Sequence, residues 1–223
     1  MQLAGKDVLL WTGKTENAPL VILHTGEAGE GQAVYQAARS LTDADFSLAA
    51  IGGLDWDGEL SPWPAPSVGK GFPAFAGKAD LYLRSLVEEI LPALEASLPH
   101  PPACRILAGY SLAGLFALYA LYRTDRFTRA VSASGSLWYP GFCDFVERHS
   151  PCRPPDKLYF SLGDREAKAK NPVLQTVQSS TERVYGWYRR LGVPTVFELN
   201  PGNHFQDTVL RTARGIAWAV QGS

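Results

Sequence analysis

The chain alternates short apolar runs with longer segments in which apolar residues recur every three or four positions. The short runs have the length and near-continuous apolar character of strands that are buried on both faces of a sheet. We predict such strands at residues 8–11, 20–23, 46–51, 105–108, 130–133, 158–162 and 195–199. Strands of this kind are typical of a parallel sheet that is covered by helices.

The segments between these runs have the periodicity of amphipathic helices. We predict helices at residues 30–41, 78–97, 111–122, 171–191 and 204–220. Pro92 is expected to kink the second of them. Asn171 offers an N-cap for the fourth, and Gly192 is expected to stop it. Repeated strand–helix–strand units predict an α/β fold with a mostly parallel central sheet and helices on both faces.

Residues 55–77 interrupt this alternation with a segment that is rich in proline, glycine and aromatic residues and has no period. A long irregular insertion in a compact chain is usually functional or disordered. The aromatic residues Trp56, Trp63, Phe72 and Phe75 favour order. We expect a flap over the carboxyl edge of the sheet, or alternatively a surface cover for the helix at 78–97. Residues 1–223 are expected to form a single domain that carries this segment.

Composition narrows the classes of protein that fit. The 21 Lys and Arg residues balance 22 Asp and Glu residues, so no basic surface for nucleic acid is indicated. No apolar stretch approaches the roughly 20 residues of a membrane span, and the first residues lack the pattern of a secretory signal. We therefore expect a cytoplasmic protein without membrane or nucleic-acid partners. Three cysteines without a CxxC pair indicate neither a disulfide framework nor a metal site.

The sequence GYSLAG at residues 109–114 joins a predicted strand to an alanine-rich predicted helix. This is the pattern of the G-x-S-x-G nucleophile elbow, in which small residues allow the strand and the helix to approach closely. It predicts Ser111 as a nucleophile, with Ala113 in place of the second glycine. The alternative is an ordinary serine N-cap at the start of a helix.

Two further residues complete a candidate triad. In α/β-hydrolases the chain order is serine, acid, histidine. Of the four histidines, only His204 follows the last predicted strand. The acid is expected in the loop after residues 158–162, where we favour Glu166 and keep Asp164 as the alternative. Either carboxylate could orient an imidazole and stabilise its charged form.

Acyl transfer also needs backbone donors for the oxyanion. Leu112 is one candidate because it directly follows the nucleophile. Gly26 is the other, since glycine permits close approach in the loop after residues 20–23, and His24 in the same region is expected to be structural. The aromatic candidates for lining a substrate pocket are Tyr110, Trp63, Trp138 and Tyr139. For each of these, packing in the core is the alternative.

The segments GYSLAGLFALY, SASGSLWYPGF, SLGDREAK and NPGNHF resemble the enterochelin-esterase and esterase D-like branch of the α/β-hydrolases. The similarity extends from Leu20 to Ala219. It implies an α/β-hydrolase fold and ester hydrolysis without a metal or an organic cofactor. It also places the family's nucleophile on Ser111, its histidine on His204 and its acid within residues 163–166.

The sequence therefore predicts a serine esterase that acts on a small or medium carboxylic ester through a Ser–His–acid triad and an acyl-enzyme. An acyltransferase would use the same residues with an alcohol in place of water. A non-catalytic binding protein on a hydrolase scaffold is the other alternative. A peptidase is disfavoured because nothing marks a site for an amine or a carboxylate. The expected partner is a small-molecule ester.

Overall fold

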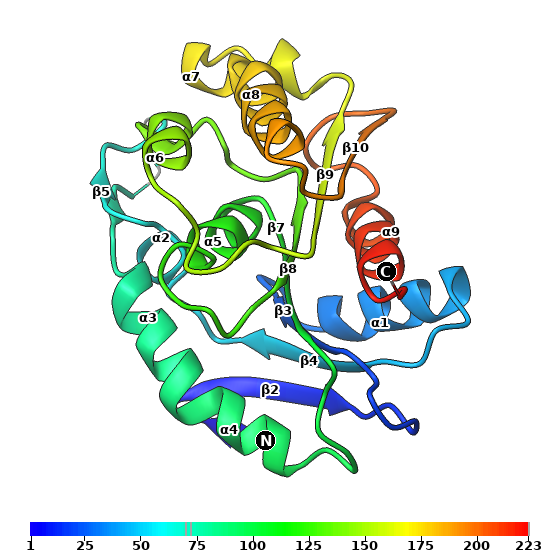
Figure 1. Ribbon diagram of the computed structural model, residues 1–223. Coiled ribbons are helices and arrows are strands. Elements are labelled where there is room, and N and C mark those ends of the chain that lie inside the picture. The colour runs from blue at the N-terminus through cyan, green and yellow to red at the C-terminus, as the bar shows by residue number, and fades with distance from the viewer. Residues whose placement is uncertain (70, 72, 223) are drawn as a thin grey trace.

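A computed structural model, which describes residues 1–69, 71 and 73–222, has a central sheet between two layers of helices (Figure 1). The helices are α1 (Glu30–Leu41), α2 (Trp56–Glu59), α3 (Ala79–Ser85), α4 (Leu91–Ala96), α5 (Leu112–Ala120), α6 (Phe142–Arg148), α7 (Pro172–Gln175), α8 (Val177–Arg190) and α9 (Thr208–Ala219). None of the helices in the described ranges is long and apolar enough to cross a bilayer.

The main sheet has the strand order β1-β2-β4-β3-β7-β8-β9-β10. Its strands are β1 (Gln2–Leu3), β2 (Lys6–Trp11), β3 (Leu20–His24), β4 (Ser47–Gly52), β7 (Arg105–Tyr110), β8 (Arg129–Ala133), β9 (Lys157–Gly163) and β10 (Thr195–Asn200). β2 is antiparallel to β1 and to β4, and every other pair of neighbours is parallel. The predicted α/β-hydrolase fold is confirmed, and the seven predicted strands are all present, with ends that differ by at most two residues.

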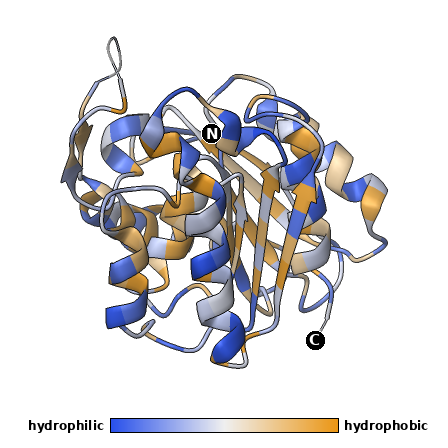
Figure 2. Ribbon diagram, turned by 90° about the horizontal axis from the view of Figure 1, so that it is seen from above, coloured by the Kyte–Doolittle hydropathy of each residue, from blue (hydrophilic) through white to orange (hydrophobic). Residues whose placement is uncertain are grey.

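Apolar cores fill both sides of the sheet. Phe116 of α5 and Tyr188 of α8 belong to the core on one face, whereas Val34 of α1 and Ile216 of α9 belong to the core on the other. Figure 2 shows the largely hydrophobic strands with helices on either side. Because the strands are buried on both faces, their sequences read as continuous apolar runs rather than as an alternation.

Pro92 alters the helix predicted at 78–97 without ending it. A π-helical segment, Leu86–Ile90, joins α3 to α4, and the N–H of Leu91 donates to the carbonyl of Leu86. Proline has no N–H and its ring crowds the carbonyl four residues earlier, so a wider turn relieves the conflict. The expected kink therefore takes the form of a π turn.

The segment 55–77 is ordered at its described residues. It contains α2 and a short antiparallel pair, β5 (Pro64–Ala65) with β6 (Phe75–Ala76). Trp63 Nε1 donates to the carbonyl of Pro140, 3.0 Å away, and Asn171 Nδ2 donates to the carbonyl of Val68. These bonds tie the segment to loops that follow β8 and β9. Phe72, one of the aromatic residues used to predict order, lies outside the described residues.

The helix predicted from residue 204 begins later, at Thr208. Gly202 (φ 111°) and Asp207 (φ 54°) both adopt the left-handed region, which prevents a helix from forming between them. His204 therefore lies on a loop. The structure also adds α6, which the sequence interpretation did not include.

We predict that His24 makes the free energy of unfolding depend on pH. This last residue of β3 is fully buried, and its Nε2 lies 2.8 Å from the hydroxyl of Tyr82. Burial lowers the pKa of His24 from 6.5 to about 3. Between these values the unfolded chain binds a proton that the folded protein does not, so stability falls as the pH falls. The free energy of unfolding should drop by up to about 1.4 kcal/mol per pH unit from this group.

Urea denaturation between pH 5.5 and 7 measures this slope at pH values where ordinary carboxylates are already ionised. His24→Gln keeps an acceptor for Tyr82 and removes the titrating ring, so its slope should be much flatter than that of the wild type. His149→Gln, at an exposed position, should keep the wild-type slope. Equal slopes for the wild type and His24→Gln would contradict the prediction.

Candidate active site

Ser111 lies between the end of β7 and the start of α5, in a strained conformation with φ 57° and ψ −121°. This is the backbone expected of a nucleophile elbow. A Cβ atom on Gly109 would overlap the Cβ of Ala113, so residue 109 must be glycine for the strand and helix to pack as they do. Alanine at position 113 is accommodated because Gly109 leaves the space free.

The structure brings Ser111, His204 and Glu166, the three candidate triad residues, together at the carboxyl edge of the sheet. His204 Nε2 lies 3.1 Å from Ser111 Oγ, and His204 Nδ1 lies 2.7 Å from Glu166 Oε2. With the proton on Nδ1 donated to the carboxylate, Nε2 is free to accept the proton of the serine hydroxyl. The three side chains therefore form one continuous chain of hydrogen bonds.

Glu166 is held as a carboxylate with one oxygen directed at His204. Its side chain is 3% exposed. Oε1 accepts hydrogen bonds from Ser134 Oγ (2.8 Å), Gly163 N (2.6 Å) and Arg211 Nη1 (3.0 Å). Burial by itself would raise the pKa of Glu166, but the bonds and charge of His204 and the donors of Gly163 and Ser134 lower it overall. Oε2 is left for the imidazole.

Asp164, the alternative acid, supports a loop instead. Its side chain is half exposed, and its Oδ1 accepts a hydrogen bond from the N–H of Gly202 at 2.8 Å. The backbone of Arg165 donates to the carbonyl of Gly202 at 3.0 Å. Asp164 therefore ties the loop after β9 to the loop that carries His204. Of the two candidate acids, Glu166 is the one whose carboxylate lies within hydrogen-bonding distance of His204.

The buried side chain of Arg211 connects the loop after β9 to the loop after β10. This residue was not assigned a role from the sequence. This side chain of α9 is 1% exposed. Besides Glu166, it donates to the hydroxyl of Tyr110 at 3.1 Å and to the carbonyl of Pro201 at 3.0 Å. A signal was present in the spacing: Gly215 and Ala219 follow Arg211 at intervals of four, and small residues on one helix face mark a close approach to the sheet.

Tyr110 was predicted to line the substrate pocket, and the structure corrects this. The side chain is buried, and its hydroxyl donates to the carbonyl of His204 at 2.7 Å. A buried tyrosine hydroxyl needs a partner, and here that partner is the backbone of the histidine. Tyr110 therefore supports His204 from the protein interior.

Ser136 also contacts the nucleophile and was not assigned a role from the sequence. Its buried hydroxyl lies 3.2 Å from Ser111 Oγ, and its N–H donates to the carbonyl of Ser111 at 3.0 Å. When Ser111 donates to His204, Ser136 can donate to Ser111 and so fix the orientation of the nucleophile. Its place after β8, the strand beside β7, was the signal available in the sequence.

The two predicted oxyanion donors differ in their availability. The N–H of Leu112, in the first turn of α5, has no hydrogen-bond acceptor among the described residues. The N–H of Gly26 donates to Glu30 Oε2 at 2.9 Å, and that of Glu27 donates to the same oxygen at 3.4 Å. Leu112 is thus free to bind an oxyanion, whereas Gly26 would first have to release the carboxylate.

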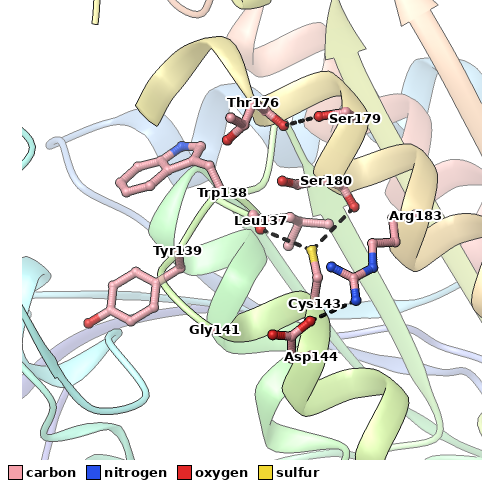
Figure 3. A pocket seen from close by; sticks show the side chains of 10 residues that line it. All are labelled: Leu137, Trp138, Tyr139, Gly141, Cys143, Asp144, Thr176, Ser179, Ser180 and Arg183. Carbon is pink, nitrogen blue, oxygen red and sulfur yellow. Dashed lines mark hydrogen bonds and ion pairs between the residues drawn. The ribbon is translucent and has the colours of Figure 1, made fainter. Parts of the chain in front are cut away.

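Figure 3 shows a cavity of about 380 Å³, and none of Ser111, Glu166 and His204 is among the residues that line it. Its walls come from residues 137–144 and from the segment that begins α8, and they include Trp138 and Tyr139, two of the aromatic candidates for a substrate pocket. Arg183 also lines it but is paired with Asp144 (2.7 Å) and Glu147 (2.6 Å), so the wall carries no free cation there.

Trp63, the remaining pocket candidate, is not part of this wall. Its ring packs against Tyr119 and Tyr139, with ring centroids 6.2 and 5.8 Å away. Its Nε1 is used by the carbonyl of Pro140. The alternative of core packing, kept open for each aromatic residue, applies to Trp63.

Several known proteins are similar to this chain in sequence or in fold. The family model described as "Putative esterase" matches residues 11–190. The uncharacterized protein YbbA from Bacillus subtilis (strain 168) is 27% identical over 130 residues, which are 57% of this chain. The match spans about half of that relative's length, 52%.

Two solved structures share the fold. An IroE-like serine hydrolase from Shewanella oneidensis superposes with a TM-score of 0.74 at 16% identity, over 96% of this chain and 75% of the other. The enterobactin esterase FES from Shigella flexneri superposes with a TM-score of 0.69 at 20% identity, over 96% of this chain and 54% of the other.

Proposed function

The chain belongs to the "Putative esterase" family, and from that premise we propose that it hydrolyses a small or medium carboxylic ester through Ser111, His204 and Glu166. The observation that carries this proposal is the chain of hydrogen bonds from Ser111 Oγ through the imidazole to the buried carboxylate. A serine in an elbow, with a base and an oriented acid, is the arrangement that activates a hydroxyl for attack on a carbonyl.

In the acylation step, His204 Nε2 removes the proton of Ser111 as Oγ bonds to the ester carbonyl carbon. The resulting imidazolium is stabilised by Glu166, whose lowered pKa keeps it ionised. The tetrahedral intermediate collapses by breaking the bond between the carbonyl carbon and the alcohol oxygen. His204 returns its proton to that oxygen, and the alcohol leaves.

In the deacylation step, water takes the place of the alcohol. His204 accepts a proton from water as the water oxygen bonds to the acyl carbon. The bond to Ser111 Oγ then breaks, Oγ regains its proton from His204, and the carboxylic acid is released. We assign the Leu112 N–H as an oxyanion donor in both steps. Gly26 is the second donor in this proposal, and it requires the Glu30 carboxylate to move aside.

In this proposal, the cavity lined by residues 137–144 and α8 receives one half of the ester. Trp138 and Tyr139 give it aromatic walls, and the charge of Arg183 is already neutralised by two carboxylates. Such a site suits an uncharged group, because an anion would meet Asp144 without a free cation to balance it.

Labelling with a fluorophosphonate tests the nucleophile. We expect one adduct per chain, and peptide mapping should place it on Ser111, while heat-unfolded protein should not react. Failure to label, or an adduct on another residue, would contradict the proposal.

The acceptor of the acyl group distinguishes a hydrolase from an acyltransferase. Hydrolysis in ¹⁸O-labelled water should place the label in the carboxylic acid product. An acyl group that is passed only to added alcohols and never to water would identify a transferase.

A further inference from the structure

We propose that Phe205 is a specificity-determining residue that binds the alcohol half of the ester and selects esters of aromatic alcohols. This inference rests on the proposed ester hydrolysis. It concerns a side chain that the triad does not use and that stands beside the catalytic histidine.

The exposure of Phe205 is unusual for a phenylalanine. Phe205 is 85% exposed as a residue, more than any other large apolar residue in the described ranges, and the next is Leu81 at 64%. The ring centroid of Phe205 lies 5.3 Å from that of His204, with the two planes perpendicular. One exposed apolar residue needs no explanation by itself, but Phe205 contacts the imidazole of His204, so a substrate that reaches this imidazole would also meet the ring.

The backbone around Phe205 holds the ring in this position. The N–H of Phe205 donates to Asn203 Oδ1 (2.9 Å), and the N–H of Asn203 donates to Gln206 Oε1 (2.8 Å). Arg165 Nη2 donates to the same oxygen of Gln206 at 3.1 Å. Asp207 has a positive φ of 54°, which is costly for a residue with a side chain. These contacts fix the conformation of the loop in which Phe205 is exposed.

The chemistry of the reaction decides which half of the ester meets this ring. His204 Nε2 returns a proton to the leaving oxygen, so that oxygen must come within hydrogen-bonding distance of Nε2. The group attached to it then lies beside the imidazole. Tyr110 contacts His204 from the interior, with centroids 5.2 Å apart, whereas Phe205 contacts it from the solvent. The alcohol group therefore arrives next to Phe205.

An aromatic alcohol gains most from this contact. Its ring can stack on Phe205 or meet it edge to face, which adds attraction beyond the apolar area that is buried. A methyl group buries little area and makes no such pair. For acetate esters we expect the wild type to prefer benzyl over methyl by about tenfold in kcat/KM.

Acetate esters of methanol, cyclohexylmethanol and benzyl alcohol test the proposal because they share one acyl group. Phe205→Ala should lower kcat/KM about tenfold for the benzyl ester and less than about twofold for the methyl ester. Phe205→Tyr should retain the preference for the benzyl ester. Phe205→Leu should reduce kcat/KM for the benzyl ester to the value for the cyclohexylmethyl ester. Leu81→Ala, at an exposed site on α3, should behave as the wild type.

Deacylation supplies a second readout. The acyl-enzyme has already lost the alcohol, so Phe205→Ala should leave the hydrolysis rate of acetylated Ser111 unchanged. The proposal is overturned by an equal change for all three esters, by the absence of a benzyl preference in the wild type, or by slower deacylation. A changed oligomeric state with an unaltered alcohol preference also overturns it. If fluorophosphonate labels Ser111, such results reject only the role of Phe205; if it does not, the proposed function itself fails.

Discussion

Replacing Ser111 with alanine is expected to lower kcat by about a million-fold, because the other members of a triad contribute little once the nucleophile is lost. In the proposed mechanism, Ser111 Oγ bonds to the acyl carbon. It lies 3.1 Å from His204 Nε2, and no other hydroxyl in the described residues forms a hydrogen bond with that nitrogen. Steady-state hydrolysis of an activated phenyl ester measures kcat, and the burst of phenol that reports acyl-enzyme formation should disappear.

The control for this substitution is Ser40→Ala, at an exposed position on α1 far from the edge that carries the triad. It should retain wild-type kinetics. The melting temperature of Ser111→Ala should stay close to that of the wild type, because removing the hydroxyl leaves the backbone of the elbow unchanged. Residual activity within a hundredfold of the wild type would exclude Ser111 as the nucleophile.

The second large effect is expected at Glu166. Glu166→Gln should lower kcat about ten thousand-fold, because a neutral amide neither fixes the tautomer of His204 nor stabilises its imidazolium. Asp164→Asn should cost less than about tenfold, since the amide oxygen can still accept from the N–H of Gly202. Full activity in Glu166→Gln combined with loss in Asp164→Asn would reverse the assignment of the acid.

Stability must be separated from chemistry in this experiment. Glu166→Gln leaves the buried guanidinium of Arg211 without its carboxylate, and an unpaired buried charge costs about 3 kcal/mol or more. Adding Arg211→Met removes that charge. The double variant should recover stability in urea denaturation but not activity. Recovery of activity together with stability would mean that Glu166 acts on the fold rather than on His204.

The sequence predicted the features that have a local period or a short motif. The strands could be found because burial on both faces leaves continuous apolar runs, and Ser111 because the elbow needs small residues within a few positions. His204 followed from chain order. Each of these features depends either on a few neighbouring residues or on the order of the elements along the chain, and the sequence contains both kinds of information.

Other features depended on contacts between distant segments. Tyr110 directly precedes the nucleophile, but nothing in its neighbours states that its hydroxyl reaches the backbone of His204, 94 positions later. Glu166 could be favoured but not distinguished from Asp164, because the choice rests on a 3₁₀ turn that brings Oε1 back to the N–H of Gly163. The role of Arg211 depends on the packing of α9, which brings its guanidinium within hydrogen-bonding distance of Tyr110, Glu166 and Pro201.

The cavity and the triad belong to different parts of the chain. Residues 137–144 and α8 form the cavity, whereas Ser111, Glu166 and His204 lie on the segments that follow β7, β9 and β10. Bonds between Asp164, Arg165 and Gly202 fasten the acid and histidine segments to each other, independently of the cavity wall. The residues that line the cavity can therefore be varied without changing Ser111, Glu166, His204 or Phe205: a library that randomises the loop at 137–144 would test whether the cavity selects the half of the ester that Phe205 does not meet.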